Sequence, residues 1–329
     1  MKTRNILFLI IILNLSFSGF SANMSEEQTL DKETYIYSIK GKDTLRLDKY
    51  EPTIAVQGAK PCVMFVFGGG FYSGTRDMKY YIPYFDFLTG NCYTVISIDY
   101  RLGFRQIDTI LKMNAKGYRA MFENAIFMAV EDLFDATLFL LEHAEEWNIN
   151  KEMIVASGSS AGGITVLQGE YEISAKGKFA QKLPANFNYA GIISFAGAIY
   201  SMSGKLKWTE NTSPIQLFHG DADKRVPYNK IQIFNTAFFG SKNIAQRLDK
   251  YNLPYYFYSE ENTDHRVAVT PMYVNKEEML TFLDKFVAQK GKLKTHVSMD
   301  YSDRPKVKKN FTIFSYIKTN SKSKEKKRN

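Results

Sequence analysis

The sequence contains few of the residues that build disulfide frameworks and metal sites. It has two cysteines, Cys62 and Cys92, and four histidines among 329 residues. Neither cysteine has a partner that indicates a metal site or thiol catalysis. The two cysteines either pair in an oxidising compartment or lie apart as small buried hydrophobic residues, and the sequence leaves both alternatives open. We therefore expect no metal centre and no cysteine chemistry.

The first 22 residues lack the length of a membrane span but have the features of an export signal. Lys2 and Arg4 precede an apolar stretch from Ile6 to Leu15, and small residues follow up to Ala22. A spanning helix needs about 20 apolar residues. We expect cleavage near Ala22 and a secreted or periplasmic protein with no stable membrane span, an uncleaved anchor being the alternative. No cysteine follows the signal, which argues against a lipoprotein.

The basic charge is confined to the two ends of the chain. The formal net charge is +9, but residues 304–329 alone carry +9 and residues 1–22 carry +2, which leaves −2 for residues 23–303. A nearly neutral body argues against nucleic acid as a partner. The basic excess indicates a solvated tail, and binding of an anionic surface by that tail is the alternative.

Short apolar runs alternate with longer amphipathic stretches along the chain, as in strands joined by crossover helices. Residues 63–67 and 95–98 are continuous apolar runs, which is typical of strands covered on both faces. Residues 35–47 alternate like an opening hairpin. The sequence thus predicts an α/β protein with a mostly parallel central sheet of about eight strands and helices on both faces.

Further elements follow from the same patterns. Strands are expected at 154–156, 192–195, 215–218 and 255–258, and helices at 120–147, about 229–251 and 276–289, with an irregular excursion at 103–118. Residues 78–88 carry aromatic side chains at helical spacing, which indicates core packing. We predict a signal peptide at 1–22, a linker at 23–33, one α/β domain at 34–290 and a basic tail at 291–329.

Gly158, Ser160 and Gly162 form a Gly-X-Ser-X-Gly pattern between a predicted strand and a predicted helix. Small flanking residues permit the sharp turn that lifts a nucleophilic serine hydroxyl out of a sheet. The five-residue pattern alone is common, and a plain glycine-rich turn is the alternative. Its position after an apolar strand is what favours a nucleophile.

A serine nucleophile needs a general base, and three histidines follow Ser160. His296 lies beyond the last helix and His219 ends a strand, whereas His265 lies in a polar loop after the strand ending at Tyr258. His265 is therefore the candidate base. Asp221 and Asp223 are the candidate acids, and spacing alone does not choose between them; a turn-capping role is the alternative for either.

An acyl-transfer site also needs backbone N–H groups that stabilise an oxyanion. Residues 67–71 (FGGGF) end an early strand with three consecutive glycines. The N–H groups of Gly69 and Gly70, together with that of Ala161 after the nucleophile, are the candidates.

The segments FGGGF, SIDYRL, GSSAGG, HGDADKRVP and DHR occur in that order between residues 67 and 266. In this the chain resembles α/β-hydrolase fold esterases of the carboxylesterase and hormone-sensitive-lipase-like family, which include bacterial polysaccharide-associated acetyl or feruloyl esterases. The resemblance covers about residues 35–289. It implies Asp223 rather than Asp221 as the acid, and structural roles for Asp99 and Arg101. The chain departs from the family at Phe67, where histidine is usual, and at Ser159, where Asp, Glu or His is frequent; both leave the subfamily open.

The resemblance implies hydrolysis of a carboxylic ester through an acyl-enzyme on Ser160, without cofactor or metal. Expected substrates are short-chain or aromatic acyl esters, small or linked to polysaccharide. Phe71, Tyr72 and Tyr100 are candidate substrate contacts, with packing as the alternative role. Two other functions stay open. One is a prolyl-oligopeptidase-like peptidase, although such enzymes usually carry a propeller domain before the hydrolase; the other is an inactive hydrolase-fold binding module.

Overall fold

A computed structural model describes residues 30–104, 115–233 and 235–301 and eight positions between 305 and 319. The predicted signal peptide, most of the predicted linker and residues 105–114 of the expected excursion lie outside the described residues. From Asp31 onward the described chain forms one compact unit. No helix in the described ranges has the length and apolar character needed to cross a bilayer.

A nine-stranded sheet runs through the centre of this unit, in the order β1-β2-β4-β3-β5-β6-β8-β11-β12. Strands β1 and β2 form the predicted antiparallel hairpin, β2 pairs antiparallel with β4, and all later pairs are parallel. The prediction of a mostly parallel sheet of about eight strands is confirmed, with one strand more. The strand bounds are β1 Glu33–Lys40, β2 Asp43–Tyr50, β3 Lys60–Val66, β4 Thr94–Ile98, β5 Ile149–Ser159, β6 Gly191–Phe195, β8 Ile215–Gly220, β11 Tyr255–Glu260 and β12 Lys294–Met299.

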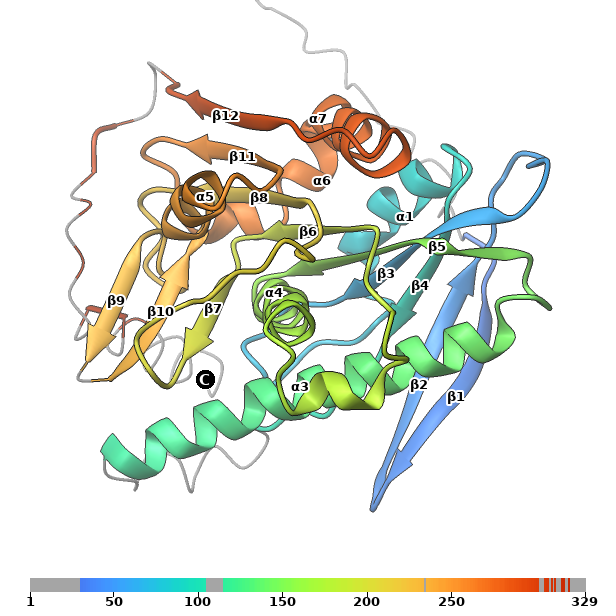
Figure 1. Ribbon diagram of the computed structural model, residues 1–329, viewed down its shortest axis with the longest axis horizontal. Coiled ribbons are helices and arrows are strands. Elements are labelled where there is room, and N and C mark those ends of the chain that lie inside the picture. Colours follow the sequence, from blue (N-terminus) through green and yellow to red (C-terminus); the bar gives the residue numbers. More distant parts are fainter. Residues whose placement is uncertain are drawn as a thin grey trace, which may run out of the picture. The chain divides into compact units, whose positions relative to one another are not determined.

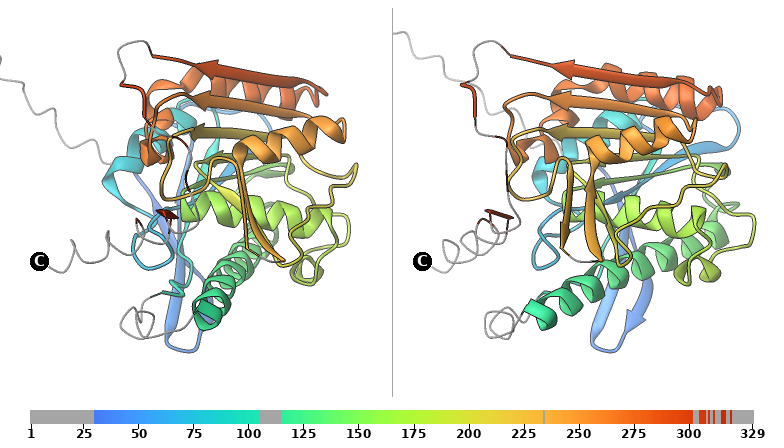
Figure 2. Two further views of the ribbon diagram at one scale, coloured as in Figure 1. Left: turned by 90° about the vertical axis from the view of Figure 1, so that its left-hand side faces the viewer. Right: turned by 60° about the vertical axis from the view of Figure 1, so that its left-hand side comes forward.

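Helices cover both faces of the sheet. Its inner strands are therefore buried along their whole length. In Figures 1 and 2, α3, α4 and α5 lie on one face and α1, α6 and α7 on the other. The helix bounds are α1 Ile82–Thr89, α3 Ala115–His143, α4 Ala161–Ser174, α5 Ser241–Lys250, α6 Pro271–Val274 and α7 Lys276–Thr281, with a π-helical turn at Phe282–Ala288 and 3₁₀ turns at Lys79–Tyr81, Phe179–Lys182 and His265–Ala268.

A second, three-stranded sheet lies beside the carboxyl ends of the central strands. It contains β7 (Ala198–Ser201), β9 (Lys230–Ile233) and β10 (Thr236–Gly240), all antiparallel. The prediction of a helix at about 229–251 is therefore wrong in its first half. The observed helix, α5, begins only at Ser241. Strand β10 contains Thr236, Phe238 and Phe239, which pack well on a pleated surface, and its pairing with β7 prevails over the helical pattern.

The end of the chain also differs from the predicted boundary. Residues 294–299, which were assigned to the basic tail, form β12 and pair in parallel with β11. Its burial pattern alternates between half-buried and exposed, as expected for an edge strand. The α/β domain therefore extends to at least Met299.

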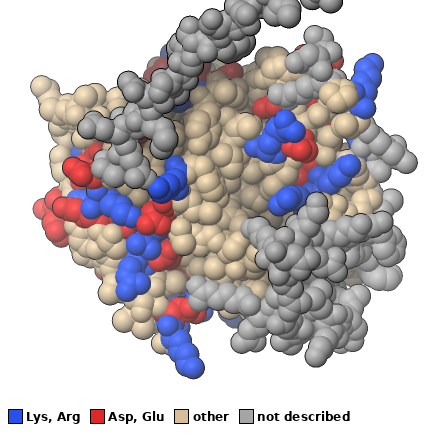
Figure 3. All heavy atoms as spheres, turned by 180° about the vertical axis from the view of Figure 1, so that it is seen from behind, with Lys and Arg blue, Asp and Glu red and all other residues tan. Residues whose placement is uncertain are grey.

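Many charged side chains on the body of the protein form ion pairs, so that basic and acidic groups lie side by side. Figure 3 shows basic and acidic side chains next to one another with neutral surface between them. Asp99 accepts a hydrogen bond from Arg76 at 2.9 Å, and Arg101 pairs with Asp132 at 2.7 Å. Asp99 and Arg101 thus have the structural contacts that the family resemblance implied. Cys62 and Cys92 are both free thiols.

Candidate active site

Ser160 lies at the sharp turn between β5 and α4, in a backbone conformation that is strained for a residue with a side chain. Its φ is +53° and its ψ is −112°. The flanking glycines are required for space: a Cβ on Gly158 would lie 2.3 Å from the carbonyl oxygen of Gly162, and one on Gly162 would lie 1.9 Å from that of Val66. The Gly-X-Ser-X-Gly pattern is therefore a packing requirement of a strained elbow that presents the serine hydroxyl.

The structure brings Ser160, His265 and Asp223 into one chain of hydrogen bonds. The Nε2 atom of His265 lies 2.8 Å from the Ser160 Oγ, and its Nδ1 atom lies 2.6 Å from the Asp223 Oδ2. The three residues follow β5, β11 and β8 respectively, so that the carboxyl ends of three parallel strands supply them. One imidazole can thus accept the hydroxyl proton on one side while a carboxylate orients it on the other.

Asp223 is fully buried and held by several donors. Its Oδ1 accepts hydrogen bonds from the backbone N–H groups of Arg225 at 2.7 Å and Val226 at 3.1 Å. Burial by itself would raise the pKa of the Asp223 carboxyl, but the charge and hydrogen bond of His265, with those of His219, lower its pKa below the ordinary value. Asp223 is therefore ionised at neutral pH and can stabilise a protonated His265.

The other candidate acid, Asp221, and the histidine of the last strand, His296, have other partners. Asp221 points away from His265: its Oδ1 accepts from the Asn262 N–H at 2.7 Å, and its Oδ2 pairs with Lys309. His296 lies on β12 and stacks on the Phe257 ring with 4.8 Å between centroids.

His219 is a site residue that sequence reasoning passed over. It is buried, its Nε2 lies 3.3 Å from the Asp223 Oδ2, and its Nδ1 hydrogen-bonds the Ser241 Oγ at 2.8 Å. His219 therefore helps to hold the carboxylate of Asp223. Its position two residues before Asp221 and four before Asp223 was the available signal.

The glycine run after β3 lies directly against the nucleophile. A Cβ built on Gly68 would lie 3.2 Å from the Ser160 Cβ. Gly69 and Gly70 have φ of +136° and +65°, which turn the backbone sharply beside Ser160. Within the described residues, neither of their N–H groups makes a hydrogen bond. Ala161 is the first residue of α4, where N–H groups have no acceptor in the helix. These three donors are thus available to a ligand.

Two further side chains hold the site together, and neither was identified from the sequence. The hydroxyl of Tyr81 accepts a hydrogen bond from the Gly68 N–H at 2.9 Å and so anchors the glycine run. The hydroxyl of Ser159 donates to the carbonyl oxygen of Ala268 at 2.8 Å and ties the elbow to the turn that carries His265. Tyr81 belongs to the aromatic stripe that was predicted to be core, and it is buried.

Two of the three predicted substrate contacts pack in the core instead. Tyr100 is 2% exposed, stacks on Phe67 and donates its hydroxyl proton to the Phe67 carbonyl oxygen at 3.0 Å. Phe71 is 1% exposed and packs edge-on against Phe104 and Tyr100. Both residues thus have the packing role that the sequence left open as the alternative. Aromatic rings near a site are indistinguishable in sequence from those beneath it. Tyr72 is half-buried next to Gly70 and stays a predicted contact.

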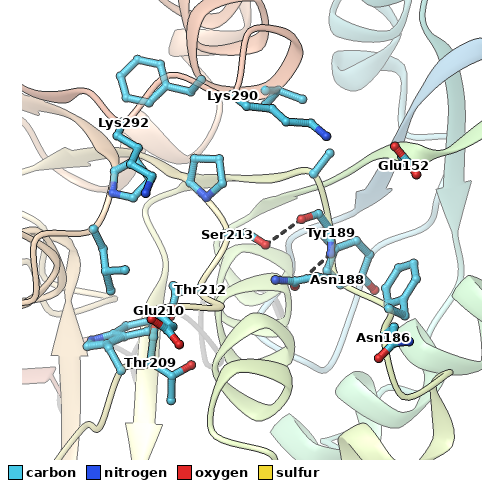
Figure 4. Close-up of a pocket in the computed structure, with 18 of the residues that line it drawn as sticks. Glu152, Asn186, Asn188, Tyr189, Thr209, Glu210, Thr212, Ser213, Lys290 and Lys292 are labelled. Atoms are coloured by element: carbon cyan, nitrogen blue, oxygen red, sulfur yellow. Dashed lines mark hydrogen bonds between the residues drawn. The ribbon is translucent and has the colours of Figure 1, made fainter.

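A separate hollow of about 950 Å³ lies at the opposite edge of the sheet (Figure 4). Asn188, Ser213 and Lys292 are among its lining residues, which come from segments just before β6, β8 and β12. The Ser213 hydroxyl donates to the Tyr189 carbonyl oxygen at 2.6 Å. No residue of the Ser160 chain lines it. Among the described residues, no cluster of His, Cys, Asp and Glu has the arrangement of a metal site.

The strand order, the strained serine turn and the position of the histidine and the acid after later strands define an α/β-hydrolase fold. Comparisons with known proteins agree with this class. The BD-FAE family model, a domain of α/β-hydrolase-type esterases, matches residues 112–203, which include Ser160 but not Asp223 or His265. No curated protein matches the chain.

The similar solved structures include several of esterase 2 from the Planctomycetes species Thermogutta terrifontis. The native enzyme is 19% identical with a TM-score of 0.57, over 79% of this chain and 95% of that one. The propionate-bound form is 20% identical with a TM-score of 0.56, over 80% and 95%. The form phosphorylated by paraoxon is also 20% identical, with a TM-score of 0.55 over the same shares. At this identity the likeness establishes the fold, and the resemblance to α/β-hydrolase esterases drawn from the sequence is confirmed at that level.

Proposed function

We propose that the protein is a serine carboxylic-ester hydrolase that works through an acyl-enzyme. The single observation that carries the proposal is the hydrogen-bonded chain from Ser160 through His265 to the buried Asp223. His265 Nε2 takes the proton of the Ser160 hydroxyl as the oxygen attacks the ester carbonyl carbon. Asp223 stabilises the imidazolium that forms, and the N–H groups of Gly69, Gly70 and Ala161 bind the oxyanion.

Release of the alcohol and hydrolysis of the acyl-enzyme use the same groups. His265 returns its proton to the leaving alcohol, and the carbon–oxygen bond to that alcohol breaks. A water molecule then attacks the acyl-enzyme while His265 takes its proton, and the acid leaves as Ser160 regains a hydroxyl. Each step moves one proton to or from the same imidazole: from the Ser160 hydroxyl, to the leaving alcohol, from water and back to Ser160.

Short-chain or aromatic acyl esters are the substrates we propose, small or carried on polysaccharide. The structures of Thermogutta terrifontis esterase 2 that are similar in fold include one bound to propionate and one bound to butyrate, both short acids. Tyr72 beside the glycine run is the proposed aromatic contact for the acyl group.

A comparison of esters with an anilide tests the proposal. We expect p-nitrophenyl acetate and butyrate to be hydrolysed with a kcat/KM at least about tenfold higher than that for the octanoate or for a dipeptide p-nitroanilide. Faster cleavage of the anilide would indicate a peptidase. Absence of turnover on every substrate, including acetylated and feruloylated xylan, would indicate an inactive binding module.

Export of the protein is a separate proposal, supported by the pattern of residues 1–22 alone. The intact mass of the protein recovered from a bacterial periplasm or medium should correspond to a chain that begins at Asn23. A full-length mass in the cytoplasmic fraction would contradict export.

A further inference from the structure

The described part of the C-terminal segment contacts the loop that carries Asp223. The hydroxyl of Tyr316 donates a hydrogen bond to the backbone carbonyl oxygen of Asp223 at 3.3 Å, and the residue is 8% exposed. Phe311 packs edge-on against Tyr316 with 5.9 Å between ring centroids, and the ammonium group of Lys224 lies 5.4 Å from the Phe311 ring centroid. Phe311 and Tyr316 thus cover the backbone of the loop that carries Asp223, which we call the acid loop, although Tyr316 lies 93 positions further along the chain.

Lys309 lies between the acid loop and the loop that carries His265. Its ammonium group pairs with the carboxylate of Asp221, two residues before the acid, and lies 3.6 Å from that of Glu261, four residues before His265. The other oxygen of Asp221 accepts from the Asn262 N–H at 2.7 Å. The N–H of Val307 in turn donates to the side chain of Asn262 at 3.3 Å. The segment therefore contacts both loops at once.

These contacts matter because Asp223 and His265 come from different loops. Their 2.6 Å hydrogen bond requires the two loops to keep a fixed spacing, and a displacement of about 1 Å at such a site can cost much of the rate. Backbone bonds such as that from Ala222 N–H to the Thr263 carbonyl oxygen, at 3.0 Å, also join the loops. Lys309 is partly exposed, so its ion pair contributes modestly.

Building on the proposed function, we propose that Lys309 and Tyr316 are positioning residues for ester hydrolysis. Together with residues 307 and 311 they form a strap that holds the acid loop against the histidine loop, and we use the word strap for these four residues. The strap gives part of the basic tail a role in the site itself. Because Lys309 and Tyr316 act on the acid loop and its neighbour, their loss should lower kcat and leave KM nearly unchanged.

Four variants of the full chain test the strap: Lys309→Gln, Lys309→Arg, Tyr316→Phe and, as matched control, Lys306→Gln. Lys306 is exposed, and its side chain makes none of the contacts found among the described residues. Turnover of p-nitrophenyl acetate is measured per active site, counted by titration with a fluorophosphonate. We expect Lys309→Gln and Tyr316→Phe to lower kcat about three- to tenfold with KM within about twofold, Lys309→Arg to keep at least about half of kcat, and the control to match the unmodified protein.

The same titration separates failure of the strap from failure of the proposed function. An unmodified protein that gives no adduct on Ser160 would overturn the esterase proposal itself. If Ser160 is labelled but Lys309→Gln and Tyr316→Phe turn over like Lys306→Gln, the strap is overturned. Fewer labelled sites with an unchanged kcat per site would overturn it too, because the contacts would then serve folding alone.

Discussion

The two edges of the central sheet differ in what they offer to a ligand. At the carboxyl edge, a strained serine, a histidine and a buried carboxylate form one chain of hydrogen bonds, with lengths of 2.8 and 2.6 Å. At the amino edge, a wide hollow of about 950 Å³ is lined by apolar residues such as Trp208 and Phe286 as well as by polar ones such as Asn188. Backbone strain and converging hydrogen bonds indicate the carboxyl edge as the place of the proposed reaction.

A buried carboxyl group near each edge shows the same difference. Asp223 at the carboxyl edge has two histidine neighbours, and its pKa is lowered despite burial. Glu170 on α4 accepts from the Ser213 N–H at 2.8 Å, next to the hollow, and its Oε2 is buried without a hydrogen-bond partner among the described residues. Burial raises the pKa of Glu170 to about 8. The histidine neighbours thus favour the ionised form of Asp223, whereas burial favours the neutral form of Glu170.

The largest effect should come from Ser160→Ala. Removal of the nucleophile should lower kcat on p-nitrophenyl acetate by about 10⁶-fold, as for other triad serines. The thermal midpoint of unfolding should stay nearly unchanged, because the hydroxyl contributes little to packing and the positive φ strains alanine about as much as serine. If the variant kept more than a hundredth of the rate, the active site would not be the one at the carboxyl edge.

His265→Ala should lower kcat by a similar factor, since the base and the nucleophile act as one unit. His296→Ala is the matched control: its ring stacks on Phe257 at the sheet edge, and its loss should change kcat less than about twofold. Steady-state kinetics of the two variants check this. The opposite ranking would show that the base was assigned to the wrong histidine.

Asp223→Asn should lower kcat by about 10⁴-fold, because an amide cannot stabilise the imidazolium. Asp221→Asn, two positions away, should cost only a few-fold through its contacts with Lys309 and Asn262. Comparable losses in both variants would mean that the two aspartates share the role of the acid.

Glu170→Gln should act on stability and leave kcat within about twofold. The folded pKa of about 8 lies above the ordinary 4.5, so between these values the folded protein keeps a proton that the unfolded chain releases. Stability of the unmodified protein should therefore fall as pH rises from about 4.5 to about 8, and the glutamine variant should show a flatter profile. Denaturant unfolding at several pH values measures both slopes, and identical slopes would contradict a neutral Glu170.

Features that depend on neighbouring residues were predictable from the sequence. The elbow at Ser160 follows from the glycines that flank it, because each is required by a contact within the turn or with the adjacent strand. The parallel strands follow from continuous apolar runs. The order of the motifs was enough to place His265 and the two candidate acids after later strands, and the family resemblance favoured Asp223 over Asp221.

Features that depend on distant partners were not predictable. Strand β10 exists because it pairs with β7, and β12 because it pairs with β11. Tyr81 and Tyr316 contact the site through hydrogen bonds with backbone atoms 13 and 93 positions away along the chain. The burial of Tyr100 likewise depends on the ring of Phe67 above it. No local pattern encodes such pairings.

Labelling with a fluorophosphonate, followed by peptide mass spectrometry, tests most directly whether Ser160 is the activated nucleophile. We predict one adduct per chain, on the peptide that contains Ser160. The adduct should form much more slowly in His265→Ala and be absent in Ser160→Ala. An adduct on a different residue, or none in a protein that still hydrolyses p-nitrophenyl acetate, would contradict this prediction.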